Sequence, residues 1–445
     1  MRFANALPLT AITLLGTLPG STGCNPGDFN SVLDHAPVVS FGTSGSSTGA
    51  ISVLALPPPS GATTKVAARM LFSRTDQTYL AVADYDKDGM VAIHVAGKEI
   101  ENLGADNQGI VESSALRSDG SIVLGTPHFF TSPTVAGGRI SVLTLTTQPD
   151  GSVVFGIQPG ATGTGHFGIA VASGDVTGLG SGESVVVSDT AVSVIGADAT
   201  TLIAQSVCQD VIFDSNSGDS YAFRPVVVGD LLTGGADEIV LGGRVNGQGR
   251  VVFLQYDGTG NLVCSPANEV LTQGTSSNFG TSLAVGDFNG DGFMDLAVGT
   301  PPDTVYVYFG PLDGVTDPAV TISSVAPSTD FGTRVATFLV PGAATAQLLV
   351  SAPAAANGQG MVMLFDLSHG ASTVLSTSAI ATLFDSNQSS NFGGLNLGGL
   401  EFNTATCQPG GTTQLVPWAS TNTDILTFFA YPNGAADPRC FAQKQ

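Results

Sequence analysis

The stretch Asn278–Pro301 reads N-F-G-T-S-L-A-V-G-D-F-N-G-D-G-F-M-D-L-A-V-G-T-P. Two short apolar runs, Leu283–Val285 and Leu296–Val298, lie on either side of an acidic, glycine-rich loop. Short apolar runs separated by turn residues are typical of β-strands joined by a tight turn. The stretch therefore predicts a strand, a loop and a second strand, and the rest of the chain contains weaker copies of it.

The loop of this stretch carries the side chains that calcium prefers. Asp287, Asn289, Asp291 and Asp295 stand at positions 1, 3, 5 and 9, with Gly292 at position 6. Calcium takes 6–8 oxygen ligands and needs a sharply folded backbone around it. An EF-hand would place a Glu at position 12 and a helix on each side, so the pattern instead indicates a calcium loop inside a β-hairpin. A catalytic carboxylate pair would need to lie across a cleft, and two carboxylates in one turn favour a shared ion instead.

Copies of the stretch recur along the chain. Their starting points lie near residues 76, 106, 166, 221, 278, 330 and 391. From residue 166 onward the starts are 52 to 61 residues apart, enough for four short strands and their turns. This period predicts an all-β fold, a seven-bladed β-propeller over residues 36–445. Residues 36–75 would complete the last blade beside Thr423–Tyr431, because a closed ring protects sheet edges that an open array leaves bare.

A second, weaker ion site is predicted in the copy near residue 76. Asp84, Asp86 and Asp88 align with the first three ligand positions of the 287–295 loop. Ala92 stands where the closing Asp295 would be, so one ligand is missing.

Composition and charge exclude some classes of function. The 445 residues include 57 glycines, and only 11% are charged, which fits an all-β repeat protein. Thirty-six acidic against 14 basic residues give a net charge of -22. Nucleic-acid binding requires clustered Lys and Arg, which the chain lacks. The acidity fits divalent cations, and it fits equally well the simple solubility of an exported protein.

The N-terminus resembles a secretory signal. Residues 1–23 begin with Met1-Arg2 and continue with an apolar run too short to span a bilayer. Ser21-Thr22-Gly23-Cys24 is similar to a bacterial lipobox, with Ser21 in place of the usual Leu. We expect a signal peptide of the lipoprotein type, lipidation of Cys24 and a tether over residues 24–35; the alternative is an ordinary cleaved signal. The protein would then lie at the bacterial outer membrane or cell surface, or be periplasmic or secreted, with membrane contact only through the anchor.

The other cysteines are even in number, and export permits disulfides. Cys208 and Cys264 lie about one repeat apart, and Cys407 and Cys440 both lie in the final repeat. Pairing within each of these sets is one interpretation, and free buried thiols are the other.

The motif N-F-G followed by V-G-D-F-N-G-D-G-F-M-D-L-A-V-G-T-P resembles the FG-GAP repeat of the integrin alpha-subunit propeller and of many bacterial exported proteins. That resemblance implies a seven-bladed β-propeller whose D-x-D/N-x-D-G-x-x-D loops hold Ca²⁺. It adds the backbone carbonyl of Phe293 to the ligands Asp287, Asn289, Asp291 and Asp295. Because only one loop is intact, we expect calcium to support a local hairpin and not the whole ring.

The sequence favours a binding protein over an enzyme. The histidines lack the spacing of a zinc motif, and Gly45–Gly49 fits G-x-S-x-G without the following helix that a nucleophile elbow needs. His166 stands in a turn position that other repeats fill with Asn or Asp, which indicates packing. We predict a non-catalytic, extracellular binding or cell-adhesion module with a protein or glycan ligand on the face opposite the calcium loops. The rivals are a carbohydrate-active enzyme on a propeller scaffold and a purely structural surface-assembly component.

Overall fold

The computed structural model describes most of the chain between residues 113 and 383 and isolated strands on either side of it. The described residues are 50–55, 66–73, 79–85, 90–95, 98–102, 113–129, 137–147, 153–180, 182–207, 225–245, 247–264, 270–274, 276–326, 329–339, 345–368, 372–383, 397–403, 413–420 and 425–429. The targeting segment and tether predicted over residues 1–35 lie outside them.

The described chain is all-β, built from runs of four antiparallel strands. The first half holds β2 (Val66–Ser73), β3 (Tyr79–Tyr85), β4 (Met90–Val95) and β5 (Lys98–Asn102); β6 (Ser113–Leu116), β7 (Ile122–Thr126), β8 (Gly137–Thr147) and β9 (Val153–Thr164); and β10 (Ala170–Gly174), β11 (Glu183–Val187), β12 (Val192–Ile195) and β13 (Leu202–Ser206).

The second half repeats this pattern. It holds β14 (Val226–Gly229), β15 (Glu238–Val245), β16 (Gln248–Tyr256) and β17 (Asn261–Cys264), with β18 (Val270–Leu271) beside β16; β19 (Ser282–Gly286), β20 (Asp295–Thr300), β21 (Thr304–Tyr308) and β22 (Val320–Ser323); β23 (Val335–Leu339), β24 (Ala346–Ala352), β25 (Met361–Phe365) and β27 (Ala381–Leu383); and β28 (Leu397–Asn403), β29 (Thr413–Ser420) and β30 (Ile425–Phe429). The short elements α4 (Ala355–Gly358), β26 (Thr373–Leu375) and η2 (Ser376–Ser378) lie in connections.

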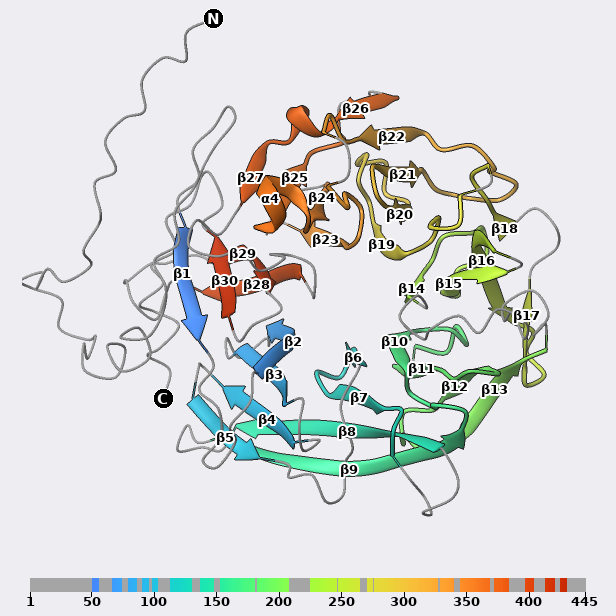
Figure 1. The fold of residues 1–445 in the computed structure, drawn as a ribbon. Coiled ribbons are helices and arrows are strands. Elements are labelled where there is room, and N and C mark those ends of the chain that lie inside the picture. The colour runs from blue at the N-terminus through green and yellow to red at the C-terminus, as the bar shows by residue number, and fades with distance from the viewer. Residues whose placement is uncertain are drawn as a thin grey trace, which may run out of the picture.

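These sheets follow one another around a ring, an arrangement consistent with a β-propeller (Figure 1). Strand β1 (Ala50–Ala55) pairs antiparallel with β30, from Ala50↔Phe429 to Ala55↔Ile425, so that segments from both ends of the chain share one sheet. The sequence placed all of residues 36–75 in that last unit. The sheet order differs for β2, which pairs with β3 and begins the next unit.

The position of β3 also differs from the sequence alignment. That alignment matched Tyr79–Asp84 to the strand that is β19, the terminal strand of its sheet. Strand β3 instead lies second in its sheet, between β2 and β4. The repeat expected to start near residue 76 therefore begins at β2.

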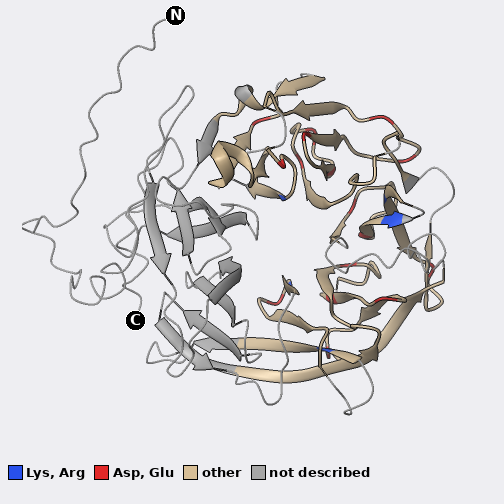
Figure 2. Ribbon diagram, in the orientation of Figure 1, with Lys and Arg blue, Asp and Glu red and all other residues tan. Residues whose placement is uncertain are grey.

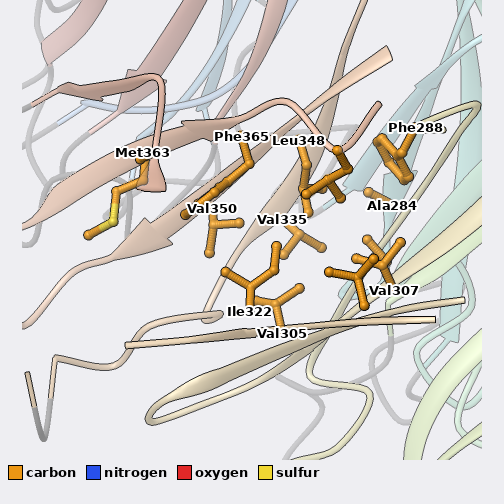
Figure 3. Packing of buried hydrophobic residues seen from close by; sticks show 14 of the residues in the cluster. Ala284, Phe288, Val305, Val307, Ile322, Val335, Leu348, Val350, Met363 and Phe365 are labelled. Atoms are coloured by element: carbon orange, nitrogen blue, oxygen red, sulfur yellow. The ribbon is translucent and has the colours of Figure 1, made fainter. Parts of the chain in front are cut away.

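Hydrophobic cores lie between neighbouring sheets. One cluster joins residues of β19–β22 to residues of β23–β25, and Figure 3 shows Val305, Val307 and Ile322 facing Val350 and neighbouring side chains across this contact. Similar clusters join each pair of successive sheets from β6–β9 to β19–β22. Strands β7, β11, β20 and β24 are buried along their whole length because a sheet packs against each of their faces.

The Phe-Gly and Gly-Thr-Pro motifs meet at these contacts. A Cβ atom on Gly299 of β20 would collide with the carbonyl oxygen of Gly332, the glycine of the next Phe-Gly pair. Gly242 stands in the same relation to Gly280. The hydroxyl of Ser282 adds a hydrogen bond to the carbonyl oxygen of Gly332 (2.9 Å). The repeat thus keeps glycine where two backbones touch, a close approach that only glycine allows.

Two outer edges are joined by parallel strand pairs. Strand β13 pairs with β17 through Gln205↔Asn261 and Ser206↔Leu262, and β22 pairs with β26. Cys208, Cys407 and Cys440 lie outside the described residues, so both disulfides stay predictions.

Candidate metal site

The predicted ion loop joins β19 to β20. The two strands pair antiparallel from Ser282↔Gly299 to Gly286↔Asp295, so residues 287–294 form the connecting loop. The buried side chain of Phe288 anchors the loop in the core. The main-chain oxygen of Asp287 accepts a hydrogen bond from the amide of Ala346 (2.7 Å), which fixes the loop against the neighbouring sheet.

Side chains at positions 1, 3 and 5 accept hydrogen bonds from backbone amides of the loop and so hold it in a compact turn. Asp287 accepts hydrogen bonds from the amides of Gly290 (2.6 Å) and Gly292 (3.0 Å). Asn289 Oδ1 accepts from the amide of Asp291 (2.8 Å), and Asn289 Nδ2 donates to Asp291 Oδ2 (2.9 Å). Gly290 and Gly292 have φ values of 85° and 90°, in the left-handed region that favours glycine. The loop is therefore compact and rich in oxygen atoms.

Asp295, at position 9, lies inside the hairpin. Its Oδ2 accepts hydrogen bonds from the amides of Phe288 (2.7 Å) and Asn289 (3.2 Å), and its Oδ1 accepts one from Gly310 (2.9 Å). The side chain is fully buried. Burial raises the pKa of this carboxyl to about 6, with a further increase from the charge of Asp291, although the three amide donors act to lower it. Asp295 thus ties the loop to the base of the second strand.

The donor types fit a hard cation. Asp287, Asn289 and Asp291 supply carboxylate and amide oxygens from the outer part of the loop, where they are exposed or half-buried. These residues would hold the ion, which would add cross-links between side chains that already bond to the loop backbone. The described residues contain no group of three or more His, Cys, Asp or Glu side chains placed to hold a metal ion. Calcium binding, with Asp295 and the Phe293 carbonyl as further ligands, stays a prediction.

Two neighbouring loops share part of the same design. The β10–β11 loop (175–182) and the β14–β15 loop (230–237) also begin with Asp and carry glycine at position 6. The amide of Gly180 donates to Asp175 Oδ2 (2.9 Å), as Gly292 does to Asp287. Gly180, Gly235 and Gly292 have φ values of 73°, 80° and 90°. Position 2 is buried in all three loops, as Val176, Leu231 and Phe288.

Position 9 is a buried acid in all three loops. Glu183, Glu238 and Asp295 each begin the second strand of their hairpin. Glu238 Oε2 accepts hydrogen bonds from the amides of Leu231 (2.9 Å) and Leu232 (3.0 Å), the same two positions that donate to Asp295 Oδ2. Burial raises the pKa of Glu238, while these donors and Gln255 lower it. The closing acid is therefore a shared structural element of these hairpins.

Sequence reasoning missed Glu183 and Glu238. It treated the copies as having lost their ligands, whereas positions 1, 6 and 9 persist and only positions 3 and 5 change. The signal was present as an acid eight residues after an Asp, which recurs from Asp175, Asp230 and Asp287. Allowing Glu for Asp at position 9 would have found it.

The weaker predicted site lies mostly outside the described residues. Asp84 is in β3, where the structure describes the backbone, and Asp86 and Asp88 fall beyond the described part. Because β3 is second in its sheet, the segment after Asp84 joins β3 to β4. It therefore does not correspond in position to the β19–β20 loop, and a second calcium site there stays a prediction.

His166 lies in a turn between β9 and β10. Its Nδ1 is 2.6 Å from Asp189 Oδ2, and its ring meets the ring of His128 edge-on at 5.0 Å. The amide of Asp189 donates to the carbonyl oxygen of Gly165, which fixes the same turn (2.6 Å). These contacts join three connecting segments of the β6–β9 and β10–β13 sheets.

Comparisons with known proteins match part of this description. The FG-GAP repeat family matches residues 279–309, which include the β19–β20 loop. No curated protein matches the chain. Among solved structures, a chain in the crystal structure of BBS1N in complex with ARL6DN, soaked with mercury, aligns with a TM-score of 0.49 and 12% identity, over 88% of this chain and 98% of that chain. The chain thus contains an FG-GAP repeat within an all-β, propeller-like arrangement.

No helix in the described part of the chain has the length and apolar character needed to cross a bilayer.

Proposed function

We propose that this protein is an exported, seven-bladed β-propeller that binds calcium and acts as a non-catalytic binding or adhesion module. Its ligand is a protein or a glycan. The observation that carries the proposal is the FG-GAP repeat at residues 279–309, whose loop holds four oxygen-bearing side chains in a hairpin. The adhesive role is inferred from the resemblance of this repeat to the FG-GAP repeats of the integrin alpha-subunit propeller.

The blade count is supported by the strand pairings. Each four-strand run from β2–β5 to β23–β27 is counted as one blade, and β28–β30 with β1 supplies the seventh. Pairing of β1 with β30 would close the ring between segments far apart in the sequence. Closure of this kind removes exposed sheet edges.

Calcium binding is tested by thermal unfolding of the full chain. Calcium sites of extracellular modules have Kd values of about 10⁻⁴–10⁻³ M, so roughly 10 mM Ca²⁺ should add about 1.4–2.7 kcal/mol. With an unfolding entropy of about 2.1 cal/mol/K per residue, the Tm should rise by about 1–3 °C. Asp291→Ala should abolish this rise, because it removes a carboxylate from the outer part of the loop.

Asp257→Ala is the matched control for that experiment. Asp257 also folds a hairpin turn, accepting hydrogen bonds from the amides of Thr259 (2.7 Å) and Asn261 (3.0 Å), but lies away from the candidate ion loop. Its variant should keep the calcium response. If calcium leaves the Tm of both the natural protein and Asp291→Ala unchanged, the proposed calcium binding is wrong.

Export and anchoring are tested separately. Cys24→Ser should release the protein from the membrane fraction, because the anchor is expected to be the only membrane contact. Equal membrane association of the natural protein and the variant would contradict lipidation at Cys24 and leave the calcium test unaffected.

A further inference from the structure

We propose that the face carrying the β10–β11, β14–β15 and β19–β20 loops binds a cationic peptide segment with apolar side chains. This inference rests on the proposed role as a binding module and gives it a face and a partner chemistry. It departs from the expectation that the partner binds the opposite face.

The three loops lie on one face because their first strands end side by side. Gly174, the last residue of β10, approaches Val228 near the end of β14, and Gly229 approaches Val285 near the end of β19. The loops are also hydrogen-bonded across the sheets. The amide of Asp175 donates to Asp237 Oδ2 (2.7 Å), so the β10–β11 and β14–β15 loops touch directly.

Large apolar side chains are exposed on these loops. Leu179 is 83% exposed, Phe293 53% and Met294 43%. The hairpins do not need them, since the apolar anchor of each loop is the buried residue at position 2. The β14–β15 loop forms with Gly234 at the position of Leu179 and Ala236 at that of Phe293. Single exposed apolar residues are ordinary. Here they lie in two loops of one face with the β14–β15 loop between them, so the partner we propose is an extended segment whose apolar side chains are spaced along it.

The same face is acidic. Asp175, Asp230 and Asp237 lie in the β10–β11 and β14–β15 loops, outside the candidate ion loop, where a bound cation would offset the charge of Asp287 and Asp291. Figure 2 shows how sparse Lys and Arg are among the described residues. An acidic face repels nucleic acid and anionic lipid headgroups and attracts a cationic partner, so the charge selects the occupant.

The arginines whose side chains are described lie away from this charge or are buried beside it. Among the described side chains, Arg117 is the basic one beside these loops, and it is buried with Nε and Nη2 donating to the carbonyl oxygen of Gly182 (3.0 and 2.8 Å). Arg244 instead donates to Ser277 (3.0 Å) and Arg334 to Thr333 (3.2 Å), at the opposite end of the strands beside the Phe-Gly turns. In the part of the chain that the structure describes, the arginine donors at the Phe-Gly end therefore have no exposed counterpart beside the three loops.

The test uses synthetic peptides and the full chain. One peptide contains lysine and leucine in equal numbers, a second replaces leucine with serine, and a third replaces lysine with glutamate. The lysine–leucine peptide should bind about tenfold or more tightly than the lysine–serine peptide, because burying even one leucine contributes about 1.5–3 kcal/mol. The glutamate–leucine peptide should not bind. Affinity for the lysine–leucine peptide should fall as salt is added.

Variants assign the site. Leu179→Ser combined with Phe293→Ser should weaken binding of the lysine–leucine peptide about tenfold or more. Leu202→Ser combined with Leu375→Ser is the matched control, because those leucines are exposed on the outer strands β13 and β26. It should bind as the natural protein does.

Three results would overturn the proposal. Equal weakening by both double variants would indicate general apolar adhesion, and equal binding of the glutamate–leucine peptide would exclude charge selection. Binding to phosphatidylserine vesicles with calcium, lost in Phe293→Ser, without binding of any peptide would identify a lipid surface as the occupant. In each case the calcium-dependent melting shift still reports on the proposed function separately.

Discussion

The β19–β20 and β14–β15 loops have the same framework and different outer surfaces. Both begin with Asp, turn at a glycine in the left-handed region, and end at a buried acid that accepts amide hydrogen bonds from positions 2 and 3. They differ at positions 3 and 5, which are Asn289 and Asp291 in one loop and Leu232 and Gly234 in the other. The comparison separates residues that fold the hairpin from residues that would bind an ion.

Removing the closing acid should produce the largest effect, and the same effect in both loops. In Asp295→Ala, the amides of Phe288, Asn289 and Gly310 lose their acceptor, and in Glu238→Ala those of Leu231 and Leu232 do. Buried donors left without a partner cost about 1–3 kcal/mol, so each variant should lose about 2–3 kcal/mol of unfolding free energy. Chemical denaturation in the presence of a calcium chelator measures this loss without the contribution of an ion.

Asp291→Ala is the control within the β19–β20 loop. Its carboxylate is exposed, so without calcium the substitution should cost less than about 1 kcal/mol. If Asp295→Ala were harmless under chelation while Asp291→Ala were severe, position 9 would be an ion ligand first and the shared framework would be wrong.

Exchanging the residues at positions 3 and 5 between the β19–β20 and β10–β11 loops should transfer the calcium response. The expected change in stability is smaller than that from removing the closing acid. The β10–β11 loop becomes D-V-N-G-D-G-S-G-E through Thr177→Asn and Leu179→Asp, which restores both outer ligands beside Asp175 and Glu183. Leu179 is exposed, so its replacement leaves the core intact. The variant should gain about 1–2 kcal/mol in about 10 mM Ca²⁺, measured as a rise in Tm.

The charge control for this exchange is Thr177→Asn with Leu179→Asn. Asparagine has the shape of aspartate without its charge, so this variant should gain much less from calcium. The reciprocal change, Asn289→Thr with Asp291→Leu, should abolish the response of the β19–β20 loop. If neither exchange changes the calcium response, positions 3 and 5 alone do not decide whether the β10–β11 or the β19–β20 loop binds calcium.

Much of the strand pattern could be predicted from the sequence because recognisable turn motifs bound the strands of each repeat. Apolar runs such as Leu283–Val285 and Leu296–Val298 became β19 and β20, since Phe-Gly and Gly-Thr-Pro fix where sheets touch. The family match over residues 279–309 coincides with this best-preserved copy. An FG-GAP repeat was therefore readable from local residues.

Two features could not be predicted because they depend on how the chain closes on itself in the fold. Tyr79–Asp84 has the pattern of a first strand, but it is second in its sheet because Val66–Ser73, which lacks a Phe-Gly signal, pairs beside it. The role of Asp295 was also incomplete. An oxygen at position 9 suits an ion, whereas its contacts with three backbone amides arise only when the loop closes over it.

The smallest expected effect is the pH dependence that Glu238 contributes in the β14–β15 loop. Burial, with the charge of Asp230 adding to it, raises the pKa of Glu238 above its ordinary value. The folded state then holds the proton more tightly than the unfolded chain. This favourable contribution is fully present below pH of about 4.5 and is lost as pH rises through the raised pKa. Glu238→Gln keeps an acceptor for Leu231 and Leu232 but cannot ionise, so its unfolding free energy should improve relative to the natural protein as pH rises through that window. Denaturation curves of Glu238→Gln and the natural protein at several pH values measure the difference in unfolding free energy. If that difference does not change with pH, the hydrogen-bond donors stabilise the carboxylate as strongly as burial destabilises it.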